Sequence, residues 1–166
     1  MEIEALGLTT LRPALRLIEA SFSGFDAEER PEIELRASLG SALYAKLLRS
    51  WGMSENLRYW VALERGDVVG VVGLYHYEKD EKEAVWLGWF AVFSSHRRRG
   101  IGSSLLDLAI QEAKAEGKRF LRLYSSTDAP KLDAHRLFEG RGFLLVKREP
   151  WPGDDGLEKL YYQLDL

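Results

Sequence analysis

The sequence contains no cysteine. That absence excludes disulfide bonds, thiolate metal ligands and a catalytic thiol, and therefore any mechanism through an acyl-cysteine intermediate. The three histidines show no metal-ligand spacing either, so we expect no metal site. Without crosslinks or metals a hydrophobic core must stabilise the fold, and 166 residues with 46% hydrophobic content are enough for one domain over residues 1–166.

Long apolar runs and an excess of positive charge are also missing. No segment is apolar for the roughly 20 residues that a membrane-spanning helix needs, and residues 1–4 are acidic where a secretory signal would be basic. The formal net charge is −3, whereas proteins that bind nucleic-acid backbones usually present a basic face. We therefore expect a cytoplasmic protein that binds neither membranes nor nucleic acids.

Hydrophobic periodicity predicts a mixed α/β fold. Alternating apolar residues bounded by turn residues predict strands at 3–6, 58–63, 68–77, 84–93, 120–124, 143–146 and 160–164. Apolar residues three to four positions apart predict helices at about 9–22, 32–50, 101–117 and 131–140. The second helix would bury a stripe made of Leu35, Leu39, Leu43 and Leu47. This order predicts a mostly antiparallel sheet with a central βαβ crossover and a C-terminal hairpin.

The segment His96–Ser104 carries most of the functional information. It lies between a predicted strand and a predicted helix, where free backbone N–H groups and the helix dipole favour an anion. Gly100 and Gly102 have no Cβ, so phosphate oxygens can approach the main chain closely. Three consecutive arginines at a helix N-terminus oppose the dipole unless an anion lies between them. The segment predicts a pyrophosphate site, with a solvated basic turn as the alternative.

Other phosphate-binding motifs fit this segment less well. The chain has no Gly-x-x-x-x-Gly-Lys-Ser/Thr string, and Leu105 stands where a dinucleotide-binding fingerprint needs its third glycine. An ATP-binding or NAD-binding domain is therefore the least favoured interpretation.

Two motifs together resemble those of the GNAT N-acetyltransferase superfamily. One is Arg97-x-x-Gly100-x-Gly102 after a strand that ends at residues 92–95, and the other is the run from Ala134 to Gly142-Phe143. The resemblance covers roughly residues 61–166. It implies an α/β fold of the GNAT-like acyl-CoA N-acyltransferase type, and transfer of an acetyl group from acetyl-CoA to a primary amine. The transfer would be a direct attack in a ternary complex, without a metal.

The resemblance also implies that the main chain does most of the cofactor binding. Backbone groups of Arg97–Ser103 would hold the pyrophosphate, and the main chain around Val92 would pair with the pantetheine arm like an added strand. The residues expected to bind acetyl-CoA are Ala91, Val92, Phe93, Arg97, Arg98, Arg99, Gly100, Ile101, Gly102, Ser103, Ser126 and Phe138.

The family's usual general acid, a tyrosine on the last helix, is replaced here by Phe138, which cannot donate a proton. The usual asparagine before that helix is absent too, and the candidates to substitute for these groups are Ser126, Lys131, Asp133 and Tyr124. The loss is tolerable because a thiol with a pKa of about 8.5 leaves easily. An amine with a pKa of about 10.4 must first lose a proton, which is the harder step.

A base for that amine would be a carboxylate near the start of the strand at 84–93. Glu81 and Glu83 are the candidates, although a solvated charged turn is the alternative for each acid, and Trp86 stands where some family members carry a glutamate. His76 could relay a proton or could simply be hydrogen-bonded.

By the same resemblance, the first two helices and their connection would form the acceptor wall, with Phe22, Phe25, Asp26 and Trp51. Trp86 and Trp89 are an odd number of residues apart, so they would face opposite sides of one strand. The acids between residues 78 and 83 favour a cationic acceptor, either a small molecule or a peptide amine. A non-catalytic acyl-CoA-binding module is the alternative function, and a homodimer is compatible with the sequence.

Overall fold

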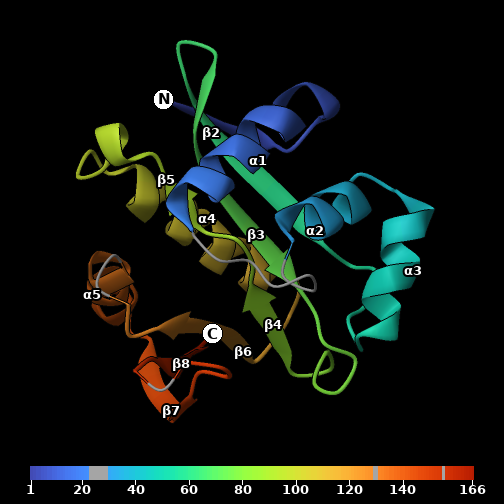
Figure 1. Cartoon of the computed structure of the whole chain (residues 1–166), viewed down its shortest axis with the longest axis vertical. Coiled ribbons are helices and arrows are strands. Elements are labelled where there is room, and N and C mark those ends of the chain that lie inside the picture. The colour runs from blue at the N-terminus through green and yellow to red at the C-terminus, as the bar shows by residue number, and fades with distance from the viewer. Residues whose placement is uncertain (23–29, 129–130, 155) are drawn as a thin grey trace.

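The computed structural model describes residues 1–22, 30–128, 131–154 and 156–166, and contains one mixed sheet of eight strands (Figure 1). The strands are β1 (Glu2–Ala5), β2 (Arg58–Glu64), β3 (Asp67–Tyr75), β4 (Ala84–Leu87), β5 (Ala91–Val92), β6 (Phe120–Ser126), β7 (Leu144–Pro150) and β8 (Glu158–Asp165). The helices are α1 (Leu8–Ser21), α2 (Pro31–Ser38), α3 (Ala42–Ser50), α4 (Ile101–Ala115) and α5 (Leu132–Gly140). Within the described residues no helix is both long and apolar enough to span a bilayer.

The strand order is β1-β2-β3-β4-β6-β8-β7, and β5 pairs with β3 beside β4. All pairs are antiparallel except β4 with β6, which are joined through α4. This parallel pair confirms the predicted central βαβ crossover, and the β7–β8 pair confirms the predicted C-terminal hairpin. The mixed, mostly antiparallel sheet confirms the predicted fold class.

Helices cover both faces of the sheet. One core cluster joins α1 and α2 to one face through residues such as Leu17, Ile18 and Leu35, and a second joins α4 and α5 to the other through residues such as Leu105 and Phe138. Figure 1 shows α1 and α2 in front of the sheet and α4 behind it. The apolar stripe of each helix is buried against the sheet, which fixes where the N-termini of α4 and α5 lie.

The predicted single helix over residues 32–50 is wrong. The chain breaks after α2 at Gly40, whose φ of 90° a helix cannot contain, and α3 starts afresh at Ala42. The four-residue spacing therefore does not continue on one face. Leu35 is fully buried, whereas Leu43 is 73% exposed, and α3 buries Leu48 instead.

Two alanine substitutions test this break. We expect Leu35→Ala to lower the free energy of unfolding by about 2–5 kcal/mol, because it leaves a cavity in the core. Leu43→Ala should change it by less than about 0.5 kcal/mol, because the side chain is solvated. Urea denaturation of both variants measures the difference, and similar losses would contradict the break at Gly40.

The predicted strand over residues 84–93 is also interrupted. Leu74 pairs with Leu87 and Val71 pairs with Ala91, so the three residues 88–90 lie opposite only two residues of β3. This extra residue is a β-bulge, and it shifts the alternation of side chains by one position. Trp86 and Trp89 consequently both join the core cluster on the α1 face, so the prediction that they face opposite sides is wrong.

The bulge also separates two neighbouring strands. The parallel pairing of β4 with β6 ends at Trp86 and Arg122; after that point β5 pairs only with β3, and β6 pairs only with β8. We call this place the strand divergence, between residues 88–92 on one side and residues 123–126 on the other. It lies beside the N-terminus of α4.

Candidate active site

The loop before α4 presents a row of unused backbone donors. In the described chain, no backbone or side-chain acceptor binds the N–H groups of residues 98–103. Arg98 and Gly100 have positive φ angles of 62° and 83°, and left-handed residues of this kind are typical of backbone loops that bind anions. Together with the N-terminal end of the α4 dipole, these groups are suited to binding an anion.

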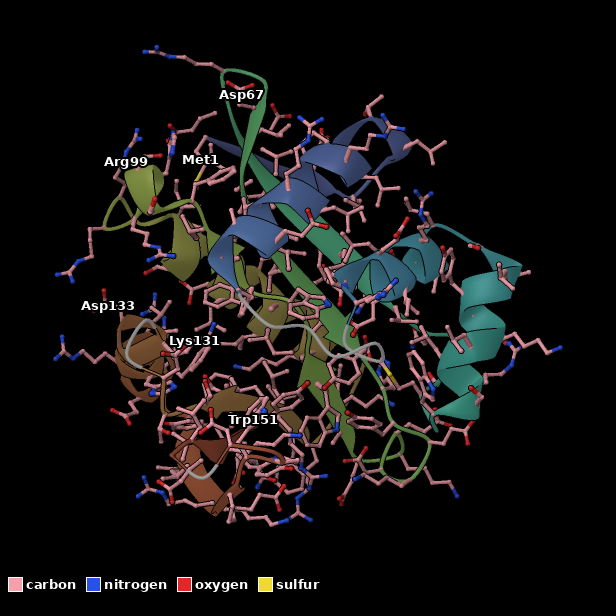
Figure 2. All side chains as sticks on the ribbon, viewed as in Figure 1. Met1, Asp67, Arg99, Lys131, Asp133 and Trp151 are labelled. Carbon is pink, nitrogen blue, oxygen red and sulfur yellow. The ribbon has the colours of Figure 1, made fainter. Side chains whose placement is uncertain are left out.

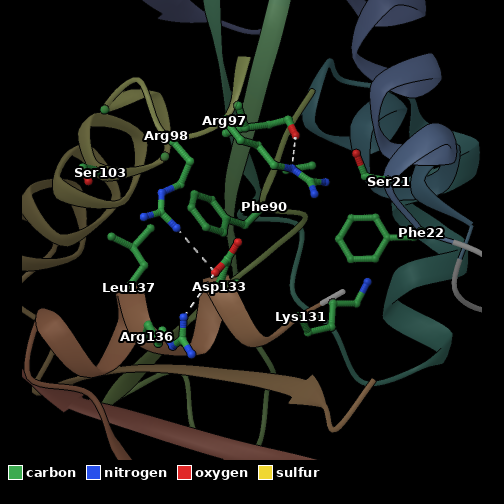
Figure 3. Close-up of a pocket in the computed structure, with 15 residues that line it drawn as sticks. Ser21, Phe22, Phe90, Arg97, Arg98, Ser103, Lys131, Asp133, Arg136 and Leu137 are labelled. Carbon is green, nitrogen blue, oxygen red and sulfur yellow. Dashed lines mark hydrogen bonds and ion pairs between the residues drawn. The ribbon is translucent and has the colours of Figure 1, made fainter. Parts of the chain in front are cut away.

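A cavity of about 540 Å³ lies in front of this loop, between β5, the end of α1 and the start of α5 (Figure 3). It is lined by Ser21, Phe22, Phe90, Ala91, Val92, Arg97, Arg98, Gly100, Gly102, Ser103, Lys131, Asp133, Ala134, Arg136 and Leu137. Four of these side chains are cationic and only Asp133 is acidic, with Arg98 and Arg136 each 3.8 Å from its Oδ1. The cavity therefore favours an anionic ligand.

Arg97 connects the loop to β5. Its Nε donates to the carbonyl of Val92 at 3.1 Å, as the dashed line in Figure 3 shows. Phe93 donates its N–H to Val69 of β3, and Ala91 is paired with Val71 of β3. Because backbone groups alternate in direction along a strand, the main chain of Val92 faces away from β3 and toward the cavity.

The structure brings together seven of the residues expected to bind acetyl-CoA, since Ala91, Val92, Arg97, Arg98, Gly100, Gly102 and Ser103 line one cavity. In Figure 2, Arg99 and Asp133 lie on the side of the molecule where α4 and α5 begin.

Five other expected residues do not line it. Arg99 turns away to an ion pair with Glu64 at 3.0 Å, Phe93 packs against the core on the α1 face, and Ser126 is buried at the end of β6. Ile101 and Phe138 are core residues, 1% and 4% exposed. The side chain of Phe138 packs against Phe90, Phe143 and Tyr162 rather than facing the cavity.

Glu81 and Glu83 also lie outside the cavity. They precede β4, whereas the cavity lies beside β5, and at roughly 3.3 Å per strand residue the two places are on the order of 20 Å apart. Glu83 forms an ion pair with Arg122 at 3.0 Å, and Arg122 also binds Asp80 at 2.7 Å. The acidic turn that favoured a cationic acceptor is therefore remote from the anion site.

The remaining sequence candidates are dispersed. His76 is 2% exposed, and its ring nitrogens lie 2.8 Å from the Asn56 carbonyl and 2.7 Å from Glu116, so the hydrogen-bonded alternative holds. Trp51 lines a separate surface hollow with Tyr77. Phe22 lines the main cavity, while Phe25 and Asp26 lie outside the described residues.

A buried tyrosine at the bulge, Tyr59, was not among the site residues predicted from the sequence. Tyr59 reaches from β2 across Gly73 of β3 to Gly88 in the bulge, and a Cβ added at either glycine would collide with it. Its hydroxyl donates to the Glu34 carboxylate of α2. Burial and then Glu34 raise the pKa of Tyr59, while a backbone hydrogen bond from Trp89 opposes the rise. No motif in the sequence joins Glu34 to Tyr59, because they meet only by packing of α2 on β2.

Tyr124 stands on the opposite side of the strand divergence. It follows Arg122, the last residue of β6 that pairs with β4. Burial raises the pKa of Tyr59 and of Tyr75, and the nearby Tyr124 adds to the rise in both. Glu34, Tyr59 and Tyr124 therefore place ionisable side chains on both sides of the divergence.

Part of this chain is similar in sequence to two named enzymes. Over 94 residues the chain is 34% identical to the aminoalkylphosphonate N-acetyltransferase of Salmonella typhimurium, a match that covers 55% of this chain and 59% of that protein. Over 115 residues it is 35% identical to the N-acetylaspartate synthetase of Xenopus tropicalis, covering 64% and 40%. The chain thus spans less than two thirds of the length of both relatives.

A solved acetyltransferase has a similar fold, and a family model matches most of the chain. An aminoglycoside 6'-N-acetyltransferase solved with coenzyme A superposes with a TM-score of 0.74, at 13% identity, over 99% of this chain and 97% of that chain. The model of the acetyltransferase (GNAT) family matches residues 20–143, which include the loop before α4, the strand divergence and α5. The chain belongs to the GNAT acetyltransferase family.

Proposed function

We propose that the chain binds acetyl-CoA and transfers its acetyl group to a primary amine by direct attack in a ternary complex. The observation that carries this proposal is the row of backbone N–H groups at residues 98–103, without acceptors in the described chain, that borders a cationic cavity. The pyrophosphate would lie on these groups, with the charges of Arg97 and Arg98 beside it. The relatives named above, one called an N-acetyltransferase and the other the synthetase of an N-acetylated product, support the acetyl donor.

The pantetheine arm would run along β5. The Val92 main chain is the part of β5 that faces the cavity, so it can pair with the amides of the arm as an added strand would. Continued in the same direction, the arm reaches the bulge at residues 88–90, where β4 and β6 part. The thioester would therefore lie at the strand divergence.

The reaction needs two proton transfers. The amine nitrogen forms a bond to the thioester carbon, the carbon–sulfur bond breaks with its electron pair on sulfur, the nitrogen loses a proton and the thiolate gains one. An amine with a pKa of about 10.4 is mostly protonated at neutral pH, which costs nearly 5 kcal/mol before attack. In this proposal the ammonium first releases one proton to solvent. Tyr59 then accepts the proton that the attacking nitrogen loses while its own proton passes to Glu34, and Tyr124 protonates the thiolate.

Two conservative substitutions test this assignment. We expect Glu34→Gln to lower kcat about 100-fold, and Tyr124→Phe about 10-fold, because each removes a proton-transfer group and little volume. The affinity for CoA should stay within threefold, since neither residue touches the loop before α4. Steady-state kinetics and isothermal titration measure the two quantities.

The chain offers a matched control. Tyr161 donates to Glu149 at 2.5 Å, on the β7–β8 hairpin outside the cavity, in the same chemical arrangement as Tyr59 and Glu34. Glu149→Gln and Tyr161→Phe should leave kcat nearly unchanged. If the control pair lowers kcat as much as the test pair, the assignment of Glu34 and Tyr124 is wrong.

The function itself is tested by thiol release from acetyl-CoA with a panel of amines. Release that depends on the amine supports the acetyltransferase. Tight CoA binding without release from any amine supports instead a non-catalytic acyl-CoA-binding module, which the burial of Phe138 at the usual acid position would favour. Competition of ATP or NAD with CoA would support a nucleotide-binding domain.

A further inference from the structure

Two neighbouring arginines of the loop before α4 point in different directions (Figure 3). Arg97 turns back to β5, where its Nε donates to the Val92 carbonyl at 3.1 Å. Arg98 points instead toward the first turns of α5, where one of its guanidinium nitrogens lies 3.8 Å from Oδ1 of Asp133. The loop therefore presents one cation on the side of β5 and another on the side of α5.

α5 supplies a second cation at the same place. Arg136 lies one turn after Asp133, and one of its guanidinium nitrogens is also 3.8 Å from Oδ1 of that aspartate. All three side chains line the cavity and are exposed at its rim. We call Arg98, Asp133 and Arg136 the rim cluster. Its single carboxylate neutralises only one of its two positive charges.

The guanidinium groups of the rim cluster can exchange Asp133 for a stronger anion. A distance of 3.8 Å is too long for a hydrogen bond, so their N–H donors remain available to a ligand. Ion pairs between exposed side chains also contribute little to stability. A phosphate monoester carries close to two negative charges at neutral pH and accepts paired N–H groups from arginine, so it competes well with one carboxylate.

The direction of the bound coenzyme decides which phosphate reaches the rim cluster. In the proposed function the diphosphate lies on the N–H groups of residues 98–103, and the pantetheine arm runs from there along β5. The ribose at the other end of the diphosphate then leaves the loop on the side of α5. Coenzyme A carries a further phosphate on the 3′-oxygen of that ribose, one sugar ring away from the diphosphate.

We propose that the rim cluster binds the 3′-phosphate of coenzyme A, and that Arg98 and Arg136 thereby select CoA over dephospho-CoA. This inference rests on the proposed function, since it assigns a second anion subsite for the same donor. The 3′-phosphate is remote from the thioester, so it stabilises the bound donor equally in the ground state and in the transition state. It therefore lowers KM for acetyl-CoA and leaves kcat unchanged.

Dephospho-CoA, which lacks only the 3′-phosphate, tests the proposal. In isothermal titrations at low salt, the Kd of the unmodified chain should be about tenfold higher for dephospho-CoA than for CoA, and added salt should reduce this ratio. Arg136→Met should lower the ratio about threefold, and the double variant Arg98→Met, Arg136→Met should bring it to about one. Asp133→Asn should raise the ratio, because it removes the anion that competes for both guanidinium groups.

Arg141 provides the matched control. It follows α5 at the other end of the helix, and its Nε donates to Oδ1 of Asp107 on α4 at 2.8 Å. Arg141→Met thus removes the same charge from the same pair of helices outside the cavity, and it should leave both affinities unchanged. Steady-state kinetics with acetyl-CoA and acetyl-dephospho-CoA give a second readout, in which the ratio appears in KM and kcat differs by less than about twofold.

The outcomes separate this inference from the proposed function. Equal affinities for CoA and dephospho-CoA, a ratio that survives in the double variant, or the same fall in Arg141→Met would overturn the 3′-phosphate subsite alone. Equal loss of both ligands in the double variant would also overturn it, because the arginines would then serve the diphosphate. A variant that still binds dephospho-CoA is folded, so that titration controls for misfolding. Failure of the unmodified chain to bind either ligand would overturn the proposed function, and the subsite with it.

Discussion

Gly102→Glu is expected to weaken CoA binding by at least about a hundredfold. The substitution places a carboxylate in the first turn of α4, next to the N–H groups that we assign to the pyrophosphate. Two like charges about 4 Å apart at an effective dielectric constant near 20 repel each other by about 4 kcal/mol, which exceeds the roughly 2.7 kcal/mol that a hundredfold loss requires. Isothermal titration with CoA and acetyl-CoA measures the change.

Gly102→Ala is the matched control. A Cβ at this position would lie 3.5 Å from Leu137 and Phe90 and 3.7 Å from Val92, which are ordinary van der Waals contacts. The alanine variant should therefore fold normally and bind CoA within about threefold of the unmodified chain. Unchanged CoA affinity in the glutamate variant would refute the pyrophosphate site, and with it the proposed function.

Gly73→Ala is expected to lower the free energy of unfolding by about 3 kcal/mol. The new Cβ would lie under 3.0 Å from the ring of Tyr59. That ring cannot move aside easily, because Tyr59 is 3% exposed and its hydroxyl is bonded to Glu34. Alanine in place of glycine would otherwise stabilise a strand slightly, so the sign of the effect is diagnostic. Urea denaturation measures the loss of free energy, and thermal denaturation should show a fall in Tm of roughly 6–12 °C.

Two controls isolate the collision with Tyr59. Gly140→Ala, at the end of α5, adds a methyl group where no atom lies within 4 Å, so it should leave stability equal or slightly higher. In a Tyr59→Ala background, Gly73→Ala should cost much less than in the unmodified chain, because the ring that it strikes is gone. Strictly additive losses in the double variant would show that Tyr59 is not the obstacle.

The element boundaries show where sequence reasoning succeeds. The strand pattern and the βαβ crossover followed from periodicity, and α4 was expected at Ile101, where the structure begins it. The two failures, at Gly40 and at the bulge of residues 88–90, share a cause. In both places the apolar periodicity of the sequence continues without interruption, although the backbone breaks at Gly40 and gains an extra residue at the bulge. Residues after each of these points therefore face a different direction from the one that the periodicity predicts.

The binding loop could be predicted from the sequence, whereas the proposed proton-transfer groups could not. The sequence by itself determined the location of the proposed anion site, because its donors are consecutive main-chain groups around Gly100, Gly102 and the start of one helix. Only the tertiary structure decided which acid stands near the divergence. Glu81 and Glu83 are close to β4 along the chain but lie at its other end, whereas Glu34 arrives from α2. Local backbone conformation is encoded by neighbouring residues, but the meeting of side chains from separate elements depends on how those elements pack.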